Sequence, residues 1–215
     1  MNAPHSPKIK VCGMRDLRNI QDLMDLQPDY MGLIFYPPSK RYVDELAEGT
    51  LEAIPETVKI TGVFVNASKE DILAKIAIYD LDALQLHGAE SPELCKELAA
   101  TGLEIIKAFG VDEEFDFSIL QAYEGLVDYF LFDTKTKLHG GSGQTFNWDL
   151  LKGYKLNTPY FLSGGLDADN IEEALKLEDT RFYAFDLNSR FELEPALKDI
   201  DKLRPVFNRI KEIPA

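Results

Sequence analysis

Long apolar stretches are absent from this sequence of 215 residues. No segment approaches the ~18 consecutive apolar residues that a membrane-spanning helix needs. Residues 1–7 also lack the basic and then apolar pattern of a secretion signal. These absences predict a cytoplasmic protein with no membrane partner. Hydrophobic residues still make up 45% of the chain, which is enough for a substantial buried core.

Basic residues are scarce relative to acidic ones. The chain has 23 lysines and arginines against 37 aspartates and glutamates, which gives a formal net charge of −14 at pH 7. A surface of this sign repels phosphate backbones, so we expect no nucleic-acid partner. If the ligand is an anion, a few local donors must bind it, because the field of the whole chain opposes its binding.

Cysteine and histidine are also rare. The two cysteines, Cys12 and Cys95, are expected to be reduced thiols, since nothing indicates secretion. The three histidines, His5, His87 and His139, are scattered along the chain, and the cysteines lack metal-ligand spacing. A structural zinc site is therefore not expected.

Short apolar segments typical of buried strands recur at fairly even intervals, and several are apolar almost throughout. They cover residues 9–14, 30–36, 59–65, 83–87, 104–109, 129–133, 160–162 and 181–187. Helical patterns lie between them, of which those over 43–53 and 113–123 are weak. Asp16, Ser68, Ser91 and Asp169 are expected near helix N-termini, and Pro205 is expected to interrupt the last helix or to kink it.

Strands alternating with helices in this number predict an α/β fold, a single (β/α)8 TIM barrel with parallel strands, over residues 8–215. Residues 1–7 are expected to form a loose N-terminal tail. A doubly wound open sheet is the alternative. In a barrel, the residues at the C-terminal ends of the strands form the site.

Two loops have the composition of a phosphate site. Ser163, Gly164 and Gly165 form a turn before a helical pattern, where glycines let backbone N–H groups approach an anion. In many barrels the loop after the last strand completes such a site, and Ser189 and Arg190 lie in that loop. An ordinary tight turn is the alternative interpretation.

Other residues at predicted strand ends can carry chemistry. Cys12 can act as a general base if nearby donors or cations lower its pKa, although a free cysteine is more often a small buried apolar residue. Asp133 follows an apolar strand, where a carboxyl group can retain a proton for donation, or it caps a loop. Arg41 has a planar donor fork that suits a carboxylate, or it is a solvated surface residue. His87 is either an acid–base group or a positioning residue.

A glycine-rich run, Gly140, Gly141, Ser142 and Gly143, is too flexible to form a rigid element. We interpret it as a mobile lid over the site, with a plain long loop as the alternative.

In this order along nearly the whole chain, eight motifs resemble those of the phosphoribosylanthranilate isomerase family. They are Lys10-Val11-Cys12-Gly13-Met14, Gly32-Leu33-Ile34-Phe35-Tyr36 with Ser39-Lys40-Arg41, Gly62-Val63-Phe64-Val65-Asn66, Gln85-Leu86-His87-Gly88, Phe132-Asp133-Thr134, Gly140-Gly141-Ser142-Gly143 with Thr145-Phe146-Asn147-Trp148, Leu162-Ser163-Gly164-Gly165-Leu166, and Asp186-Leu187-Asn188-Ser189.

The resemblance implies the Amadori rearrangement of N-(5-phosphoribosyl)anthranilate to 1-(2-carboxyphenylamino)-1-deoxyribulose 5-phosphate in tryptophan biosynthesis, with no cofactor and no metal. It implies Cys12 as general base and Asp133 as general acid. Arg41 is implied to bind the substrate carboxylate. The phosphate donors are implied to be Gly164, Gly165 and Ser189.

Two positions depart from the family pattern, since Arg190 and Ala196 stand where glycine is frequent. Arg190 either adds a charged contact to the phosphate or points outward, and it would be strained if its φ were positive. Ala196 is expected at the start of the final helix. A related phosphosugar barrel enzyme, or a catalytically silent phosphate-binding barrel, is the alternative to the isomerase. The sequence does not decide between a monomer and a homodimer.

Overall fold

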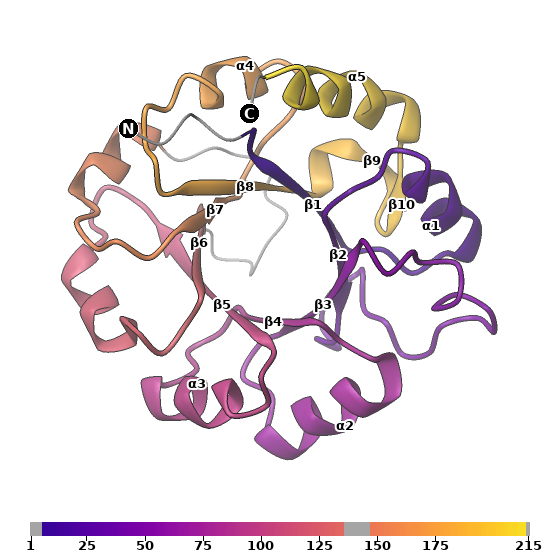
Figure 1. Ribbon diagram of the computed structural model, residues 1–215, viewed down its shortest axis with the longest axis horizontal. Coiled ribbons are helices and arrows are strands. Elements are labelled where there is room, and N and C mark those ends of the chain that lie inside the picture. Colours follow the sequence, from indigo (N-terminus) through magenta and orange to yellow (C-terminus); the bar gives the residue numbers. More distant parts are fainter. Residues whose placement is uncertain (1–5, 136–146, 214–215) are drawn as a thin grey trace.

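Eight parallel strands close into a barrel in chain order (Figure 1), which confirms the predicted fold. The structure, a computed structural model, describes residues 6–135 and 147–213. The strands are β1 Lys8–Cys12, β2 Tyr30–Ile34, β3 Lys59–Phe64, β4 Ala83–Leu86, β5 Glu104–Val111, β6 Tyr129–Thr134, β7 Tyr160–Leu162 and β8 Phe182–Leu187.

The barrel closes where β1 pairs with β8, and this pairing brings distant residues together. Lys10 is the register partner of Asp186, and on the other side of β1 Cys12 is the partner of Gly32 on β2. Most strand residues are buried, as expected when helices cover the outer face and side chains fill the inner one.

The helices lie outside the ring of strands (Figure 1). Asp16, Ser68 and Ser91 are N-caps as predicted, because each side chain accepts a hydrogen bond from the backbone N–H three residues later. Among the described residues the helices are α1 Leu17–Met24, α2 Lys69–Tyr79, α3 Pro92–Ala99, α4 Ile171–Ala174 and α5 Ile200–Lys211.

Several predicted helices differ from those observed. Residues 43–53 contain turns and no helix, and the weak pattern over 113–123 is a 3₁₀ helix over Phe117–Tyr123. Further 3₁₀ segments cover Trp148–Gly153 and Ser189–Phe191. The N-cap of α4 is Asn170, the residue after Asp169, so Asp169 lies near the helix N-terminus as expected.

Pro205 lies inside α5 and does not end it, contrary to the predicted interruption. The helix continues because its inner face buries Leu203, Val206, Phe207 and Ile210. Burial of several large side chains outweighs the ~3 kcal/mol that a proline costs within a helix.

An antiparallel hairpin follows β8 and was not predicted. It consists of β9 Glu192–Glu194 and β10 Leu197–Lys198, and it lies beside α1 (Figure 1), where the Asn19 side chain bonds the backbone of Lys198. Ala196 is in the hairpin turn with φ of 72°, and not at the start of the final helix. Glycine tolerates this left-handed conformation better than alanine, which explains why a glycine suits this position.

The described residues form no helix that combines the length and the apolar character needed to cross a bilayer.

Candidate active site

A cavity opens at the C-terminal ends of the strands and brings most of the predicted site residues together. It encloses about 810 Å³ of space between atoms, part of which is continuous with solvent. Seven of its eighteen lining residues were predicted site or positioning residues, namely Cys12, Arg41, His87, Asp133, Gly164, Gly165 and Ser189.

Cys12 is the last residue of β1 and is almost fully buried. Its thiol has room because β2 carries glycine at the paired position: a Cβ on Gly32 would lie 2.7 Å from Cys12 Sγ. Burial raises the pKa of the Cys12 thiol above its ordinary value, although the nearby Lys10 ammonium group opposes this effect. The neighbouring cations Lys10 and Lys198 lower the pKa of this thiol, but burial outweighs them.

Lys10 and Asp186 form a buried ion pair across the seam between β1 and β8, and Asp186 lines the cavity. Lys10 Nζ lies 2.8 Å from Asp186 Oδ1, and the lysine side chain is fully buried. Burial opposes the ammonium charge, but the Asp186 carboxylate raises the pKa of Lys10 above its ordinary value. The Lys10 ammonium group lowers the pKa of the Cys12 thiol and so favours the thiolate form, whereas the Asp186 carboxylate raises this pKa.

Asp133 lies near the end of β6, where one of its oxygens accepts a hydrogen bond and the other faces His87. Oδ1 accepts a hydrogen bond from the Thr134 N–H at 2.8 Å, and Oδ2 lies 3.4 Å from His87 Nε2. His87 Nδ1 is in turn 2.8 Å from Gln85 Nε2. When Gln85 donates, the proton of the neutral imidazole is on Nε2 and faces Asp133. His87 Nε2 therefore faces Asp133 Oδ2 across the cavity lining.

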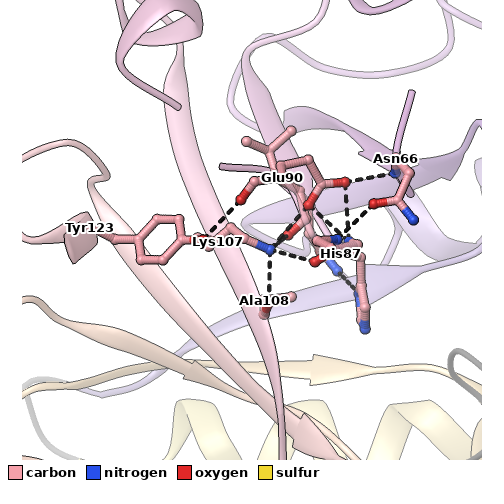
Figure 2. A network of polar contacts seen from close by, with 10 residues as sticks. Asn66, His87, Glu90, Lys107, Ala108 and Tyr123 are labelled. Carbon is pink, nitrogen blue, oxygen red and sulfur yellow. Dashed lines mark hydrogen bonds and ion pairs between the residues drawn. The ribbon is translucent and has the colours of Figure 1, made fainter. Parts of the chain in front are cut away.

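A second buried ion pair supports the loop that carries His87 (Figure 2). Lys107 Nζ lies 3.0 Å from Glu90 Oε2 and also donates to the carbonyl oxygens of Leu86 and Gly88, at 3.1 and 2.8 Å. Glu90 accepts from the N–H groups of Asn66 and Gly88. The pair thus ties the loops after β3 and β4 to β5.

The predicted phosphate end of the cavity is built from backbone. Gly164 and Gly165 have φ of 86° and 63°, which disfavours other residues. A Cβ on Gly164 would lie 2.5 Å from the Thr134 nitrogen, so only glycine fits there. These glycines and Ser189 line the cavity, whereas Arg190 is exposed and is not among the described residues that line it. Arg190 does not have a positive φ, so its backbone lacks the strain that a positive φ would cause.

Arg41 reaches the cavity from the loop after β2, but Glu192 already holds it. Arg41 Nε donates to Glu192 Oε1 at 2.8 Å, and Nη2 donates to Oε2 at 2.6 Å. Lys198 Nζ approaches Glu192 Oε1 to 2.5 Å and also donates to Asn188 Oδ1 at 2.8 Å. Sequence reasoning missed Glu192 and Lys198, because their hairpin has no counterpart in the alternation of strands and helices.

The predicted lid, Gly140, Gly141, Ser142 and Gly143, lies outside the described residues. Within residues 6–135 and 147–213, no three His, Cys, Asp or Glu side chains converge in a way that could hold a metal ion. Cys95 is a buried residue of α3 and does not line the cavity.

A family model described as N-(5′-phosphoribosyl)anthranilate (PRA) isomerase matches residues 9–209. The N-(5′-phosphoribosyl)anthranilate isomerase of Parabacteroides distasonis is 47% identical over 204 residues, which cover 94% of this chain and 92% of the relative. The corresponding protein of Phocaeicola vulgatus is 45% identical, with coverage of 95% and 98%.

Solved structures agree with the sequence relatives. The phosphoribosylanthranilate isomerase of Thermotoga maritima has a TM-score of 0.82 at 33% identity, covering 96% of this chain and 100% of that one. A phosphoribosylanthranilate isomerase in complex with reduced 1-(o-carboxyphenylamino)-1-deoxyribulose 5-phosphate has a TM-score of 0.78 at 30% identity, with the same coverage.

The fold, the rim cavity and these relatives define an isomerase built on a (β/α)8 barrel. More specifically, the chain belongs to the N-(5′-phosphoribosyl)anthranilate isomerase family, which acts in tryptophan biosynthesis. The family resemblance drawn from the motifs is thereby confirmed.

Proposed function

We propose that this protein rearranges N-(5-phosphoribosyl)anthranilate to 1-(2-carboxyphenylamino)-1-deoxyribulose 5-phosphate without a cofactor, with Asp133 as general acid and Cys12 as general base. The observation that carries the proposal is that both side chains line one cavity, from the ends of β6 and β1. An aldose-to-ketose shift needs an acid and a base on one sugar, and these two groups supply them.

The proton transfers balance. The Asp133 carboxyl group donates its proton to the ring oxygen as the bond from that oxygen to C1′ breaks, and the nitrogen lone pair of the substrate forms the iminium ion. The Cys12 thiolate, which is the minor form because burial raises the pKa of this thiol, then takes the proton from C2′, and the electrons of that bond neutralise the iminium nitrogen. The resulting enol tautomerises to the ketone. No lysine is needed, because the substrate provides the nitrogen.

The two ends of the substrate require local donors, because the whole chain has a net charge of −14. Arg41 binds the anthranilate carboxylate, and the backbone at Gly164, Gly165 and Ser189 binds the phosphate, with Arg190 adding attraction from outside the cavity. In support, Arg41 lines the cavity along with these three residues. Hydrogen-bond donors concentrated at the two ends of the substrate can bind an anion even though the net negative charge of the chain repels it.

The test measures the rate at which purified variants remove the fluorescence of the substrate N-(5-phosphoribosyl)anthranilate. Cys12→Ser and Asp133→Asn should each lower kcat by about 10²- to 10⁴-fold, the usual contribution of a general acid or base, while analogue binding persists. Cys95→Ser is the matched control, since Cys95 is a buried thiol that does not line the cavity. Near-normal turnover by Cys12→Ser or Asp133→Asn would remove that residue from the mechanism. The cytoplasmic location and the choice between monomer and homodimer stay predictions.

A further inference from the structure

The guanidinium of Arg41 is oriented by a carboxylate of the chain itself, and the proposed mechanism gives that carboxylate no role. Glu192 binds Arg41 side-on, through Nε at 2.8 Å and Nη2 at 2.6 Å. The Glu192 side chain is only 5% exposed and that of Arg41 14%. A two-point contact between nearly buried partners fixes the plane and the direction of the guanidinium.

This side-on contact leaves the other edge of the guanidinium available. A guanidinium group has five N–H donors, and Glu192 engages one on Nε and one on Nη2. Among residues 6–135 and 147–213, no acceptor is hydrogen-bonded to Arg41 Nη1. The edge formed by Nη1 and Nη2 can therefore accept a second carboxylate in two-point geometry without displacing Glu192.

Two cations surround the single carboxylate of Glu192. Lys198 Nζ is 2.5 Å from Glu192 Oε1, and the Lys198 side chain is fully buried. Burial opposes the charge on Glu192, but Arg41 and Lys198 together hold the pKa of its carboxyl group below the ordinary value. Burial lowers the pKa of Lys198, although the Glu192 carboxylate opposes this effect. With Lys198 protonated, the cluster of Arg41, Glu192 and Lys198 carries one net positive charge. Without Lys198, the contact with Glu192 would neutralise Arg41.

Gly13 keeps the Arg41 side chain in place from below. Its φ is 81°, and a Cβ there would lie 2.6 Å from Arg41 Cδ. The methylene carbons of Arg41 therefore pack directly on the backbone that follows Cys12, while Glu192 binds the guanidinium. Gly13 thus lies between Arg41, the proposed carboxylate-binding residue, and Cys12, the proposed base.

We propose that Glu192, assisted by Lys198, is a positioning residue that sets the preference of this enzyme for a substrate with a carboxylate on the aromatic ring. It holds Arg41 so that the Nη1–Nη2 edge faces the cavity, while Lys198 preserves the net positive charge. This inference rests on the proposed binding of the substrate carboxylate by Arg41. The opposite possibility is that Glu192 competes with the substrate for Arg41.

The experiment compares the binding of two probes by calorimetry. The first is reduced 1-(o-carboxyphenylamino)-1-deoxyribulose 5-phosphate, and the second is the same molecule without the ring carboxylate. In Glu192→Gln, the preference for the carboxylated probe should fall about tenfold, as expected for a charged hydrogen-bond pair that is no longer fixed. Binding of the second probe should change little, and KM should rise more than kcat falls.

Matched variants exclude a general effect of the hairpin. Glu194→Gln removes the same charge from an exposed position on the same strand and should leave the preference unchanged. Glu192→Asp keeps the charge on a shorter side chain and should restore part of the preference. Circular dichroism and thermal melting report whether each variant is folded.

Each outcome supports or overturns a defined statement. If Glu192→Gln binds the carboxylated probe as tightly as the unmodified protein or more tightly, Glu192 does not position Arg41 and the inference is wrong. If both probes lose affinity equally, the role of Glu192 is only structural and the inference is again wrong. Arg41→Gln tests separately the proposed binding of the substrate carboxylate by Arg41. If this variant keeps the preference for the carboxylated probe, the proposed role of Arg41 itself is wrong.

Discussion

Removing the ammonium group of Lys107 should destabilise the protein more than any surface change. Lys107 and Glu90 are both 1% exposed at their side chains, and Lys107 Nζ also serves the carbonyl oxygens of Leu86, Gly88 and Ala108 (Figure 2). Lys107→Met keeps the volume but leaves the Glu90 carboxylate buried without its cation. Breaking a buried pair from one side costs about 3–5 kcal/mol.

Differential scanning calorimetry measures this loss directly. For a chain of this size each kcal/mol lowers Tm by about 2–4 °C, so Lys107→Met should lower Tm by about 6–20 °C. Adding Glu90→Gln removes the unpaired charge and keeps an acceptor for the N–H groups of Asn66 and Gly88. The double variant should therefore melt above Lys107→Met.

An exposed ion pair provides the control for this calculation. Lys69 and Glu97 lie 2.9 Å apart with side chains 40% and 54% exposed, and such pairs contribute only about 0–1 kcal/mol. Lys69→Met should hardly change Tm. The reasoning is refuted if Lys107→Met melts within a degree or two of the unmodified protein, or if Glu90→Gln added to it brings no recovery.

Three other predictions concern the site. Burial raises the pKa of the Cys12 thiol, so its thiolate forms at a higher pH than that of an ordinary cysteine. The rate at which iodoacetamide alkylates Cys12 should therefore keep increasing through pH 9. A rate that reaches a plateau by neutral pH would contradict this. Gly32→Ala would put a Cβ 2.7 Å from Cys12 Sγ and should lower kcat at least tenfold with a smaller change in KM; steady-state kinetics decide, and normal turnover would show that the thiol can move freely. Arg190→Gly should raise KM at unchanged kcat if Arg190 attracts the phosphate, whereas an unaltered KM would remove Arg190 from the site.

Local signals in the sequence were sufficient for much of the scaffold. The alternation of buried strands and capped helices predicted the barrel, and Asp16, Ser68 and Ser91 cap their helices as expected. Such caps depend on residues only three positions apart, so they can be predicted without the fold. In the same way, Cys12 and Asp133 were found at strand ends, where barrels carry their sites.

Other features depended on packing that local patterns do not encode. Pro205 predicted an interrupted helix, but α5 continues because its buried face stabilises it. The weak pattern over 43–53 predicted a helix where the chain forms turns. Short patterns have little intrinsic helical stability, so tertiary contacts decide between these outcomes.

The sequence by itself determined the class of fold, the family and the residue types available for proton transfer, because these depend on periodicity and on motifs at strand ends. Only the tertiary structure decided which charges meet. It paired Lys10 with Asp186 across the barrel seam and brought Glu192 and Lys198 to Arg41. The physical reason is that an ion pair depends on distance in space, and closing the barrel joins residues that are far apart along the chain.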